Sequence, residues 1–374
     1  MGQQPLQSRV VMLVDLDYFF AQCEELRNPS IKDKPVVVCV YSGRTEDSGA
    51  VSTANYIARG YGVKSGMPIF LAKKRLENTN AVLLPVYYAF YEEISGKVMD
   101  TLKGFADRFE QVGIDEAYLD VTLRAKGNFE QGRRLAENVK SEVLSRQRLT
   151  CSIGVGPNKL VAKIAADTKK PDGLTVVTPE QATVFLAPLP VSRLIGVGKK
   201  TKERMQTLGI NTIFDLSNFD MQKLIAVFGK TQATYFHNAS HGTDDEPVRE
   251  RGEASSISRI STLKQDSREL SFILEKTEQL CSEIHVTIAE DRLTYRTVGI
   301  IVITTDMAIH TRSKTLENST NSLDTMKATV KELLEKFFDQ TESEARRIGV
   351  KISNFAREQK NQRQLTSFIE QSKH

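Results

Sequence analysis

The segment VVMLVDLDYFF, residues 10–20, is the stretch that decides how the chain begins to fold. Its opening apolar run predicts a buried β-strand. The strand ends in two acids, Asp15 and Asp17, and three aromatic residues follow at once. A core strand normally lacks carboxylates, because a buried charge must be paired or bound to a metal. The two acids therefore indicate either a functional site or a solvated turn.

The composition is that of a globular protein with several domains. The chain has 374 residues, 40% of them hydrophobic and 26% charged, which predicts about two to four domains. Its longest apolar runs, VVVCV and VGIIVI, are much shorter than the roughly 20 residues that span a bilayer. The N-terminal MGQQPLQSR shows no apolar signal region. We therefore expect a cytoplasmic protein with no membrane partner.

Cysteine, histidine and charge content limit the classes of partner. The four cysteines are far apart without CxxC spacing, and there are only five histidines, which argues against a zinc cluster or a disulfide framework. The net charge of +4 permits a nucleic-acid partner without requiring one.

A second pair of acids lies in the segment GIDEAYLD, where Asp115 and Glu116 fall at the predicted turn of a β-hairpin. Neighbouring strand residues point to opposite faces, so both acids can serve one site only at a turn or strand end. Alone, such a pair is usually solvated. Beside Asp15, however, two adjacent strand ends could bring three carboxylates together, which is tolerable only with cations present.

The ligand chemistry favours a hard cation and a nucleotide. No histidine or cysteine lies near these acids, so oxygen ligands favour Mg²⁺ or Mn²⁺ over zinc, and Mg²⁺ commonly completes its shell with substrate phosphates. No Walker-type loop is present. Candidate phosphate ligands are Thr53, Tyr56 and Arg59, on one face of a predicted short helix, and Lys163 in NKLVAKIAAD. Each could instead be a helix cap or a solvated basic residue.

The chain changes character along its length. Residues 1 to about 175 predict one α/β unit, a mixed sheet with helices on one face and a helical insertion near residues 21–86. Short helices with glycine turns follow, and GVGKKTKERMQ resembles a helix–hairpin–helix element whose helix N-terminus binds DNA phosphate. Its DNA-contact candidates are Gly196, Gly198, Lys199 and Lys200. A polar linker then leads to a second, smaller α/β domain and a polar tail.

These motifs together carry a family resemblance. VDLDYFF, SGAVSTANYIARGYGVKSGMP, GIDEAYLD, SIGVGPNKLVAKIAADTKKPDG and RIGVKISNF occur in this order between Val10 and Phe355. With them the sequence resembles the Y-family translesion DNA polymerases of the DNA polymerase IV type, in a layout closest to archaeal members. The resemblance implies a multidomain α/β (α+β) fold. Its parts would be a palm (1–20 and 87–175), small fingers (21–86), an all-α thumb (176–245), a little finger (246–357) and a tail (358–374).

The resemblance also implies an activity: template-directed, error-prone DNA synthesis by a monomer without a proofreading exonuclease, from primer–template DNA and dNTPs. Asp15, Asp115 and the Leu16 carbonyl would bind two Mg²⁺ ions, with Mn²⁺ as a substitute, and Glu116 would complete the catalytic group, also as a metal ligand. Asp17 would be structural. Phe20, tyrosine in many relatives, would discriminate sugars by ring bulk. The nucleotide-binding set would be Phe19, Phe20, Thr53, Tyr56, Arg59 and Lys163.

Two C-terminal features predict further contacts. Residues 249–357 contain 17 Lys+Arg and 17 Asp+Glu, so DNA binding there would depend on the placement of charges. The candidates lie in or beside predicted strands: Arg259, Lys264, Arg346, Arg347 and Lys351. The tail resembles a sliding-clamp-binding peptide with Gln362, Leu365, Phe368 and Ile369, although Ile369 replaces the usual second aromatic and a frayed terminus is the alternative.

Two other functions remain to be weighed. A nucleotide cyclase could use the same acids and metals, but it would need neither a helix–hairpin–helix segment nor a strand-rich second domain. A catalytically silent DNA-binding scaffold would not need Asp15, Asp115 and Glu116 together. Primer extension on a template distinguishes a polymerase from both.

Overall fold

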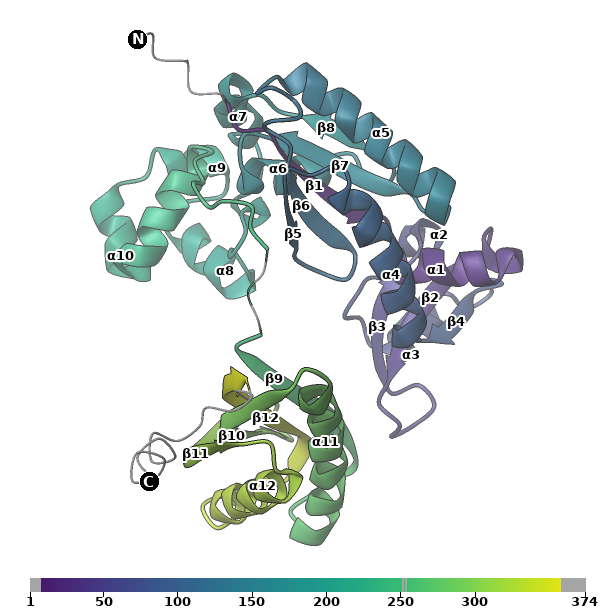
Figure 1. Ribbon diagram of the computed structural model, residues 1–374, viewed down its shortest axis with the longest axis vertical. Coiled ribbons are helices and arrows are strands. Elements are labelled where there is room, and N and C mark those ends of the chain that lie inside the picture. The colour runs from purple at the N-terminus through teal and green to yellow at the C-terminus, as the bar shows by residue number, and fades with distance from the viewer. Residues whose placement is uncertain (1–7, 251, 253, 358–374) are drawn as a thin grey trace, which may run out of the picture. The chain divides into compact units, whose positions relative to one another are not determined.

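The computed structural model describes residues 8–250, 252 and 254–357 (Figure 1). They form two compact units. The first comprises residues 8–39, 51–67 and 71–250, and the second comprises 252 and 254–357 with the short stretches 40–50 and 68–70. Within the described part of the chain, no helix combines the length and the apolar composition needed to cross a bilayer.

A five-stranded sheet forms the centre of the first unit, with β1 (Val11–Leu16) as its middle strand. β1 is antiparallel to both of its neighbours, β6 and β7, whereas β7 and the edge strand β8 are parallel to each other. The predicted mixed sheet is therefore confirmed. The strand order is β5-β6-β1-β7-β8. The other strands are β5 (Arg108–Gln111), β6 (Glu116–Asp120), β7 (Cys151–Gly156) and β8 (Leu174–Val176).

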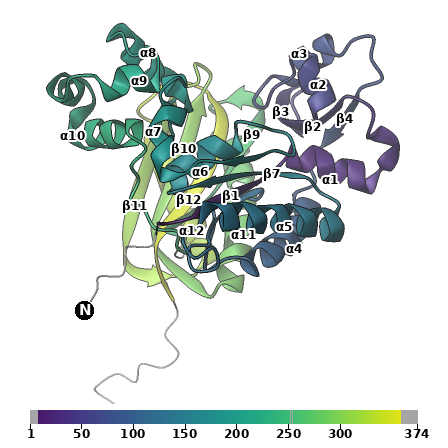
Figure 2. The ribbon, with the colours of Figure 1, turned by 90° about the horizontal axis from the view of Figure 1, so that it is seen from above.

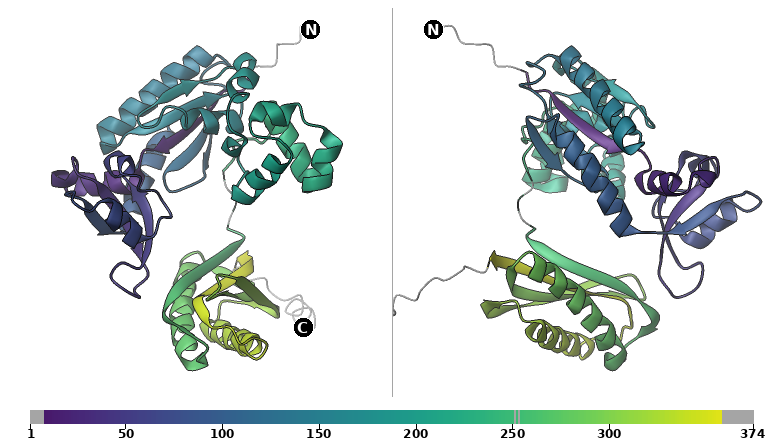
Figure 3. Two further views of the ribbon diagram at one scale, coloured as in Figure 1. Left: turned by 180° about the vertical axis from the view of Figure 1, so that it is seen from behind. Right: turned by 45° about the vertical axis from the view of Figure 1, so that its right-hand side comes forward.

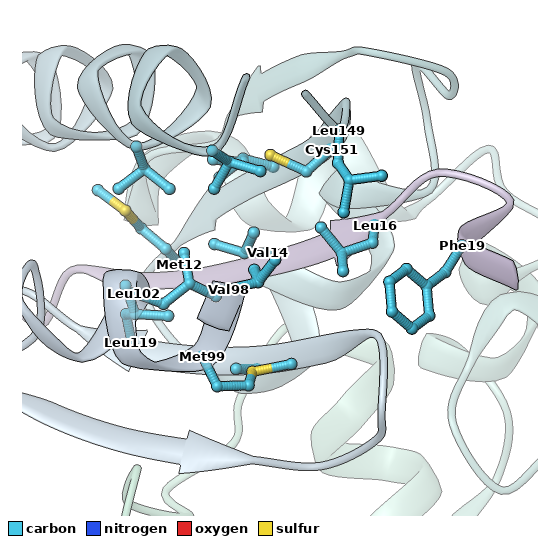
Figure 4. Close-up of a cluster of buried hydrophobic side chains, with 14 of the residues drawn as sticks. Met12, Val14, Leu16, Phe19, Val98, Met99, Leu102, Leu119, Leu149 and Cys151 are labelled. Atoms are coloured by element: carbon cyan, nitrogen blue, oxygen red, sulfur yellow. The ribbon is translucent and has the colours of Figure 1, made fainter. Parts of the chain in front are cut away.

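Helices cover both faces of this sheet. Even-numbered residues of β1 pack against α4 (Tyr88–Lys103) and α5 (Phe129–Gln147), and Figure 4 shows Met12, Val14 and Leu16 in this core. Val11 and Leu13 point the other way and pack with α6 (Lys159–Ala166). The expectation of helices on one face is therefore wrong. A middle strand that is apolar on both sides needs both faces covered.

We had expected the insertion after β1 to be helical. It contains helices and also a three-stranded sheet of order β3-β2-β4, so that expectation is wrong. Its residues Ala21, Cys23, Val36 and Val38 belong to the same apolar core as β1. The strands are β2 (Val36–Tyr41), β3 (Gly49–Ala54) and β4 (Val82–Pro85). The helices are α1 (Phe19–Arg27), η1 (Pro29–Ile31), α2 (Tyr56–Gly60) and α3 (Ile69–Arg75).

The last part of the first unit is helical, as predicted, and in Figure 2 helices α8, α9 and α10 gather in one cluster. Gly196 has a φ of 82°, which favours glycine, and Gly198 precedes the first residue of α8. Gly229 interrupts α10 with a φ of 77°. The helices are α7 (Pro179–Leu186), η2 (Val191–Arg193), α8 (Lys199–Thr207), α9 (Ile213–Ser217) and α10 (Met221–Ser240).

The second unit is an antiparallel four-stranded sheet of order β11-β10-β12-β9. Its two long helices lie on one face, as Figure 3 shows, and the core between them and the sheet is apolar. The strands are β9 (Ser256–Ser267), β10 (Leu293–Thr304), β11 (Ile309–Thr320) and β12 (Ala345–Arg357). The helices are α11 (Leu270–Glu290) and α12 (Leu323–Phe338). Among the described residues of this unit, no helix lies on the other face of the sheet.

Gly154 of β7 sets the distance between α6 and the sheet, since a methyl group there would overlap the Ala162 carbonyl oxygen and the Ala166 backbone nitrogen. We predict that Gly154→Ala lowers the free energy of unfolding by about 3 kcal/mol, the upper part of the usual overpacking range. The matched control is Gly96→Ala in α4, where a methyl group meets nothing within 4 Å and should add about 0.5–1 kcal/mol. Urea denaturation measures both; equal stability of the two variants would contradict the close approach of α6.

Candidate active site

Three acids come together at the end of β1, as the hairpin pattern predicted. Asp15 lies directly opposite Glu116 in the β1–β6 register, and cross-strand Cβ atoms at such positions are about 4.5–5.5 Å apart. Asp115 occupies the bend just before β6, and the Leu16 N–H donates to its carbonyl oxygen at 2.8 Å. Because the backbone at Asp115 is irregular, the side chains of the consecutive residues Asp115 and Glu116 can both lie beside Asp15. We call the region of these three acids the acidic corner.

Helix α6 delivers Lys163 to these acids. Asn158 begins the helix, and its side-chain oxygen accepts from the Val161 N–H at 2.9 Å. The Lys163 Nζ lies 3.4 Å from Asp15 Oδ2 and donates to Glu116 Oε2. This contact depends on the close packing of α6 on β7, because the helix lies on the same face as Asp15 and Glu116. The structure thus brings the predicted phosphate ligand beside the predicted metal ligands.

A second lysine, absent from the sequence prediction, also contacts Asp15. The Lys170 Nζ lies 2.7 Å from Asp15 Oδ2 and 3.2 Å from Asp167 Oδ1. The sequence contained one indication that Lys170 could lie on the same side as Lys163, because the two lysines are seven residues, or about two helical turns, apart. That signal was weak, because Lys170 follows the end of α6 rather than lying within the helix.

The electrostatics of the corner are those of crowded acids balanced by two lysines. Burial, and then the charges of Asp15 and Glu116, raise the pKa of Asp115. Burial alone would lower the pKa of Lys163 and of Lys170. In both lysines the neighbouring acids outweigh that effect, and the pKa is raised. The ammonium groups are therefore held charged against the carboxylates.

These residues fit a hard divalent cation by their chemistry. All the donors are oxygens, and burial together with the charges of Asp15 and Glu116 raises the pKa of Asp115, an effect that a bound cation would oppose. Among the described residues, no three His, Cys, Asp or Glu side chains are placed to hold an ion as they stand. The reason is visible in the contacts: Asp15 and Glu116 each face a lysine ammonium group. A cation would take the place of that contact.

Asp17 has the structural role expected of it. It is 1% exposed, and its carboxylate accepts from Ser152 Oγ at 2.7 Å and from the Asp172 N–H at 2.9 Å. Lys140 in turn donates to the Asp172 carboxylate at 2.6 Å and to the Cys151 carbonyl at 2.7 Å. The network fastens the turn after Lys170 to the end of β1.

The predicted phosphate-binding segment is a strand followed by a helix. Thr53 lies in β3, so the expectation that it shares a helix face with Tyr56 and Arg59 is wrong. The helix begins only at Tyr56, because the side-chain oxygen of Asn55 accepts from the Ala58 N–H and caps it. The Tyr56 ring lies 5.5 Å from the Tyr18 ring and 4.6 Å from the Arg59 guanidinium. Burial raises the pKa of Tyr56, and the charges of Asp17 and Asp15 add to that rise, whereas Arg59 and Lys170 oppose it.

Glu25 and Asn55 form a buried link that sequence reasoning missed. The Asn55 Nδ2 donates to Glu25 Oε1 at 2.9 Å and to the Lys34 carbonyl at 2.8 Å. Tyr18 Oη donates to the other oxygen of Glu25 at 3.3 Å. Burial raises the pKa of Glu25 although these hydrogen bonds act to lower it. The link connects α1 to the cap of α2.

Phe20 is braced by a second aromatic ring. It stacks on Tyr91 with ring centroids 4.3 Å apart, and the Tyr91 hydroxyl donates to Glu24 Oε1 at 2.7 Å. Phe19 is 2% exposed and points into the core (Figure 4), which leaves only its backbone for contact with a nucleotide.

The C-terminal candidates divide between the two faces of the second sheet. Arg347 and Lys351 alternate with the core residues Ile348, Val350 and Ile352, so they lie on the face without helices. Arg259 pairs with Val350 on the covered face, and its guanidinium is 3.4 Å from Thr287 Oγ1 of α11. Lys264 follows the buried Leu263, and Arg346 is 3.7 Å from Asp266. The predicted clamp-binding residues, 362–369, lie outside the described residues.

Comparison with known proteins accounts for nearly the whole chain. Family models match residues 14–167 (impB/mucB/samB family), 192–244 (DNA polymerase-iota, thumb domain) and 254–367 (impB/mucB/samB family C-terminal domain). DNA polymerase IV of Nitrosopumilus maritimus is 46% identical over 365 residues, 97% of this chain and 100% of that protein. The chain belongs to the Y-family of DNA polymerases.

Other members of the Y-family agree with this assignment. DNA polymerase IV of Saccharolobus solfataricus is 38% identical over 92% of this chain and 96% of its own length. A chimeric Y-family polymerase superposes with a TM-score of 0.88 at 38% identity, covering 93% of this chain and 99% of its own. An insertion ternary complex of Dbh DNA polymerase gives 0.68 at 37% identity, with the same coverage. The helical segment is thus the thumb, and the C-terminal sheet domain is the little finger.

Proposed function

We propose that this Y-family polymerase carries out translesion synthesis with Asp15, Asp115 and Glu116 as its catalytic acids, and that it works as a cytoplasmic monomer. The single observation that carries the assignment of residues is the meeting of these acids at the end of β1, with Lys163 beside them. The polymerase activity itself follows from the family. A cyclase or a silent scaffold is not favoured, because thumb and little finger domains both match polymerase models.

The acids would hold two Mg²⁺ ions, for which Mn²⁺ could substitute, with the Leu16 carbonyl as a further ligand. When bound, the ions supply charge stabilisation for attack of the primer 3′-oxygen on the α-phosphorus and for the leaving pyrophosphate. The protein's own contribution is placement. The β1–β6 register fixes Asp15 against Glu116, and the bend before β6 holds the partly buried Asp115 beside them.

The nucleotide would lie between α2 and α6. Tyr56 and Arg59 on α2 and Lys163 on α6 offer hydrogen bonds and positive charge to a triphosphate, and Thr53 offers a hydroxyl from β3. Phe20 would stand beside the sugar, where the stack on Tyr91 keeps the ring from turning aside. Phe19 would contribute through its backbone.

The duplex would be held by backbone contacts in the thumb and little finger. In the thumb, the N-terminus of α8 presents N–H groups, with Gly196 and Gly198 shaping the turn and Lys199 and Lys200 adding charge. In the little finger, Arg347 and Lys351 lie on the face of the sheet opposite its helices, with Ile260 and Ile301 flanking Gly349 between them. Lys264 and Arg346 would lie at the margins of this face, and Arg259 would add a weaker contact from the covered face.

Asp115→Asn should separate catalysis from stability. Because burial and neighbouring acids raise the pKa of Asp115, its ionised form weakens the fold above that pKa, and the amide cannot ionise. We predict that primer extension falls by about a thousandfold or more, whereas the melting temperature in EDTA at pH 8 rises above that of the wild type. Asp100→Asn, an exposed acid on α4, should change neither. Extension within tenfold of wild type would refute the catalytic assignment.

Phe20→Ala should admit ribonucleotides, because loss of the ring opens space beside the sugar 2′ position. We expect the ratio of rNTP to dNTP incorporation, measured as kcat/KM, to rise by about tenfold or more. Tyr88→Ala removes only an edge-on neighbour of Phe20, 6.0 Å from its ring, and should leave the ratio near that of the wild type. An unchanged ratio in Phe20→Ala would show that another group excludes the 2′-hydroxyl.

The two arginines on opposite faces of the little finger provide a matched pair. Arg347→Ala should weaken DNA binding to a similar extent on all sequences and reduce the slope of log K against log salt by about 1. Arg259→Ala removes the same charge from the covered face and should change the slope less. Fluorescence anisotropy over a series of NaCl concentrations measures both. An equal effect of the two changes would mean that net charge, rather than the open face, binds the backbone.

The tail is proposed to dock on a sliding clamp. Leu365, Phe368 and Ile369, at spacings of three and four, can form a plug on one side of a single helical turn, and Gln362 completes the pattern. Deletion of residues 360–374 should leave synthesis without the clamp unchanged and abolish its stimulation by the clamp. Full stimulation of the truncated enzyme would place the docking site elsewhere.

A further inference from the structure

We propose that Lys170 is a tethered counter-ion for Asp15, which it releases when a divalent cation binds. Its Nζ bridges two carboxylates, at 2.7 Å from Asp15 Oδ2 and 3.2 Å from Asp167 Oδ1. An ammonium group at hydrogen-bond distance occupies the oxygen that a metal ligand must offer. The inference therefore rests on the proposed role of Asp15 as a ligand.

The surroundings of Lys170 leave its side chain as the part that can move. Just beyond it, the Asp172 N–H donates to Asp17 Oδ2 at 2.9 Å, and Lys140 holds the Asp172 carboxylate at 2.6 Å. The backbone of this turn is thus fastened to the sheet. The Lys170 side chain is about a quarter exposed and already contacts a second acid, Asp167, which is a third exposed. Displacement from Asp15 would leave it paired with Asp167 instead of unpaired.

Lys163 is less suited to this role. It lies farther from Asp15, at 3.4 Å, and it also donates to Glu116. Lys170 makes the shorter contact with Asp15, and its second partner, Asp167, follows the end of α6 and is not one of the three proposed catalytic acids.

Two opposite effects follow from a tethered counter-ion. Without metal, the ammonium group offsets repulsion among Asp15, Asp115 and Glu116, so its loss should destabilise the metal-free protein. With metal, it competes for Asp15, so its loss should tighten metal binding. A lysine that only braced the fold would produce the first effect without the second.

The test uses the full chain, with neither DNA nor nucleotide, and Mn²⁺ as the probe. Mn²⁺ affinity is measured by electron paramagnetic resonance, and thermal stability is measured in EDTA. Lys170→Gln should lower the Kd for Mn²⁺ by about threefold to tenfold, the range expected from losing one competing ion pair, and should lower the melting temperature in EDTA. Lys169→Gln removes the same charge from an exposed neighbour without an ion pair among the described residues, and should change neither. Lys170→Arg keeps the charge and should match the wild type. A Kd for Lys170→Gln no lower than that for Lys169→Gln would overturn the proposal.

A double-mutant cycle tests the second partner. Asp167→Asn leaves Lys170 with Asp15 alone, so it should weaken Mn²⁺ binding in the wild-type background and have little effect in the Lys170→Gln background. If Asp167→Asn weakened Mn²⁺ binding equally in the two backgrounds, Asp167 would act directly on the ion. That result would overturn the proposal that Lys170 moves from Asp15 to Asp167. Asp15→Asn distinguishes the two levels of inference. If it leaves Mn²⁺ affinity intact, the proposed ligand role fails. If it abolishes binding while Lys170→Gln changes nothing, only the counter-ion role fails.

Discussion

Asp15, Asp115 and Glu116 bring three negative charges into one partly buried corner, and charges placed so closely repel one another unless cations lie among them. Much of the palm can be understood as the means of supplying those cations. Two lysines reach the corner from α6 and the turn behind it. The strands supply rigidity, because each acid leaves a strand end that is already fixed by pairing. The three carboxylates repel one another without positive charge and are stabilised when cations lie among them, as the proposed binding of metal ions requires.

Helix α6 can bring Lys163 to the acids only because two residues of β7 beneath the helix are glycines. Gly154 and Gly156 lie on the face of β7 that meets the helix, and a methyl group at either position would contact helix atoms. The helix therefore lies against the sheet backbone itself. This close approach, a feature of packing, is what places Lys163 within 3.4 Å of an acid on the neighbouring strand. The position of Lys163 beside Asp15 and the packing of α6 on the sheet are therefore fixed by the same contacts.

The sequence predicted those parts of the site that local rules determine. The hairpin turn at Asp115 and Glu116 was predictable because alternation and turn position lie within a few residues of each other. Thr53 was assigned to the wrong element, since β3 forms by pairing with β2, which local periodicity does not report. Lys170 and the buried Glu25 were missed because their partners are distant in sequence. Likewise, the face on which Arg259 lies follows only from its register with β12.

The helix that carries Tyr56 and Arg59 has only five residues, far too few for an isolated helix to be stable in water. The helix is therefore stabilised by Asn55, which caps it, and by Glu25, which holds the Asn55 side chain in place. Loss of those few hydrogen bonds would unwind the helix while leaving the core around β1 intact, which is the condition for local unfolding. Amide hydrogens of α2 should consequently exchange with solvent much sooner than those of β1. The helix α2 can thus unfold and refold locally while the core around β1 stays folded.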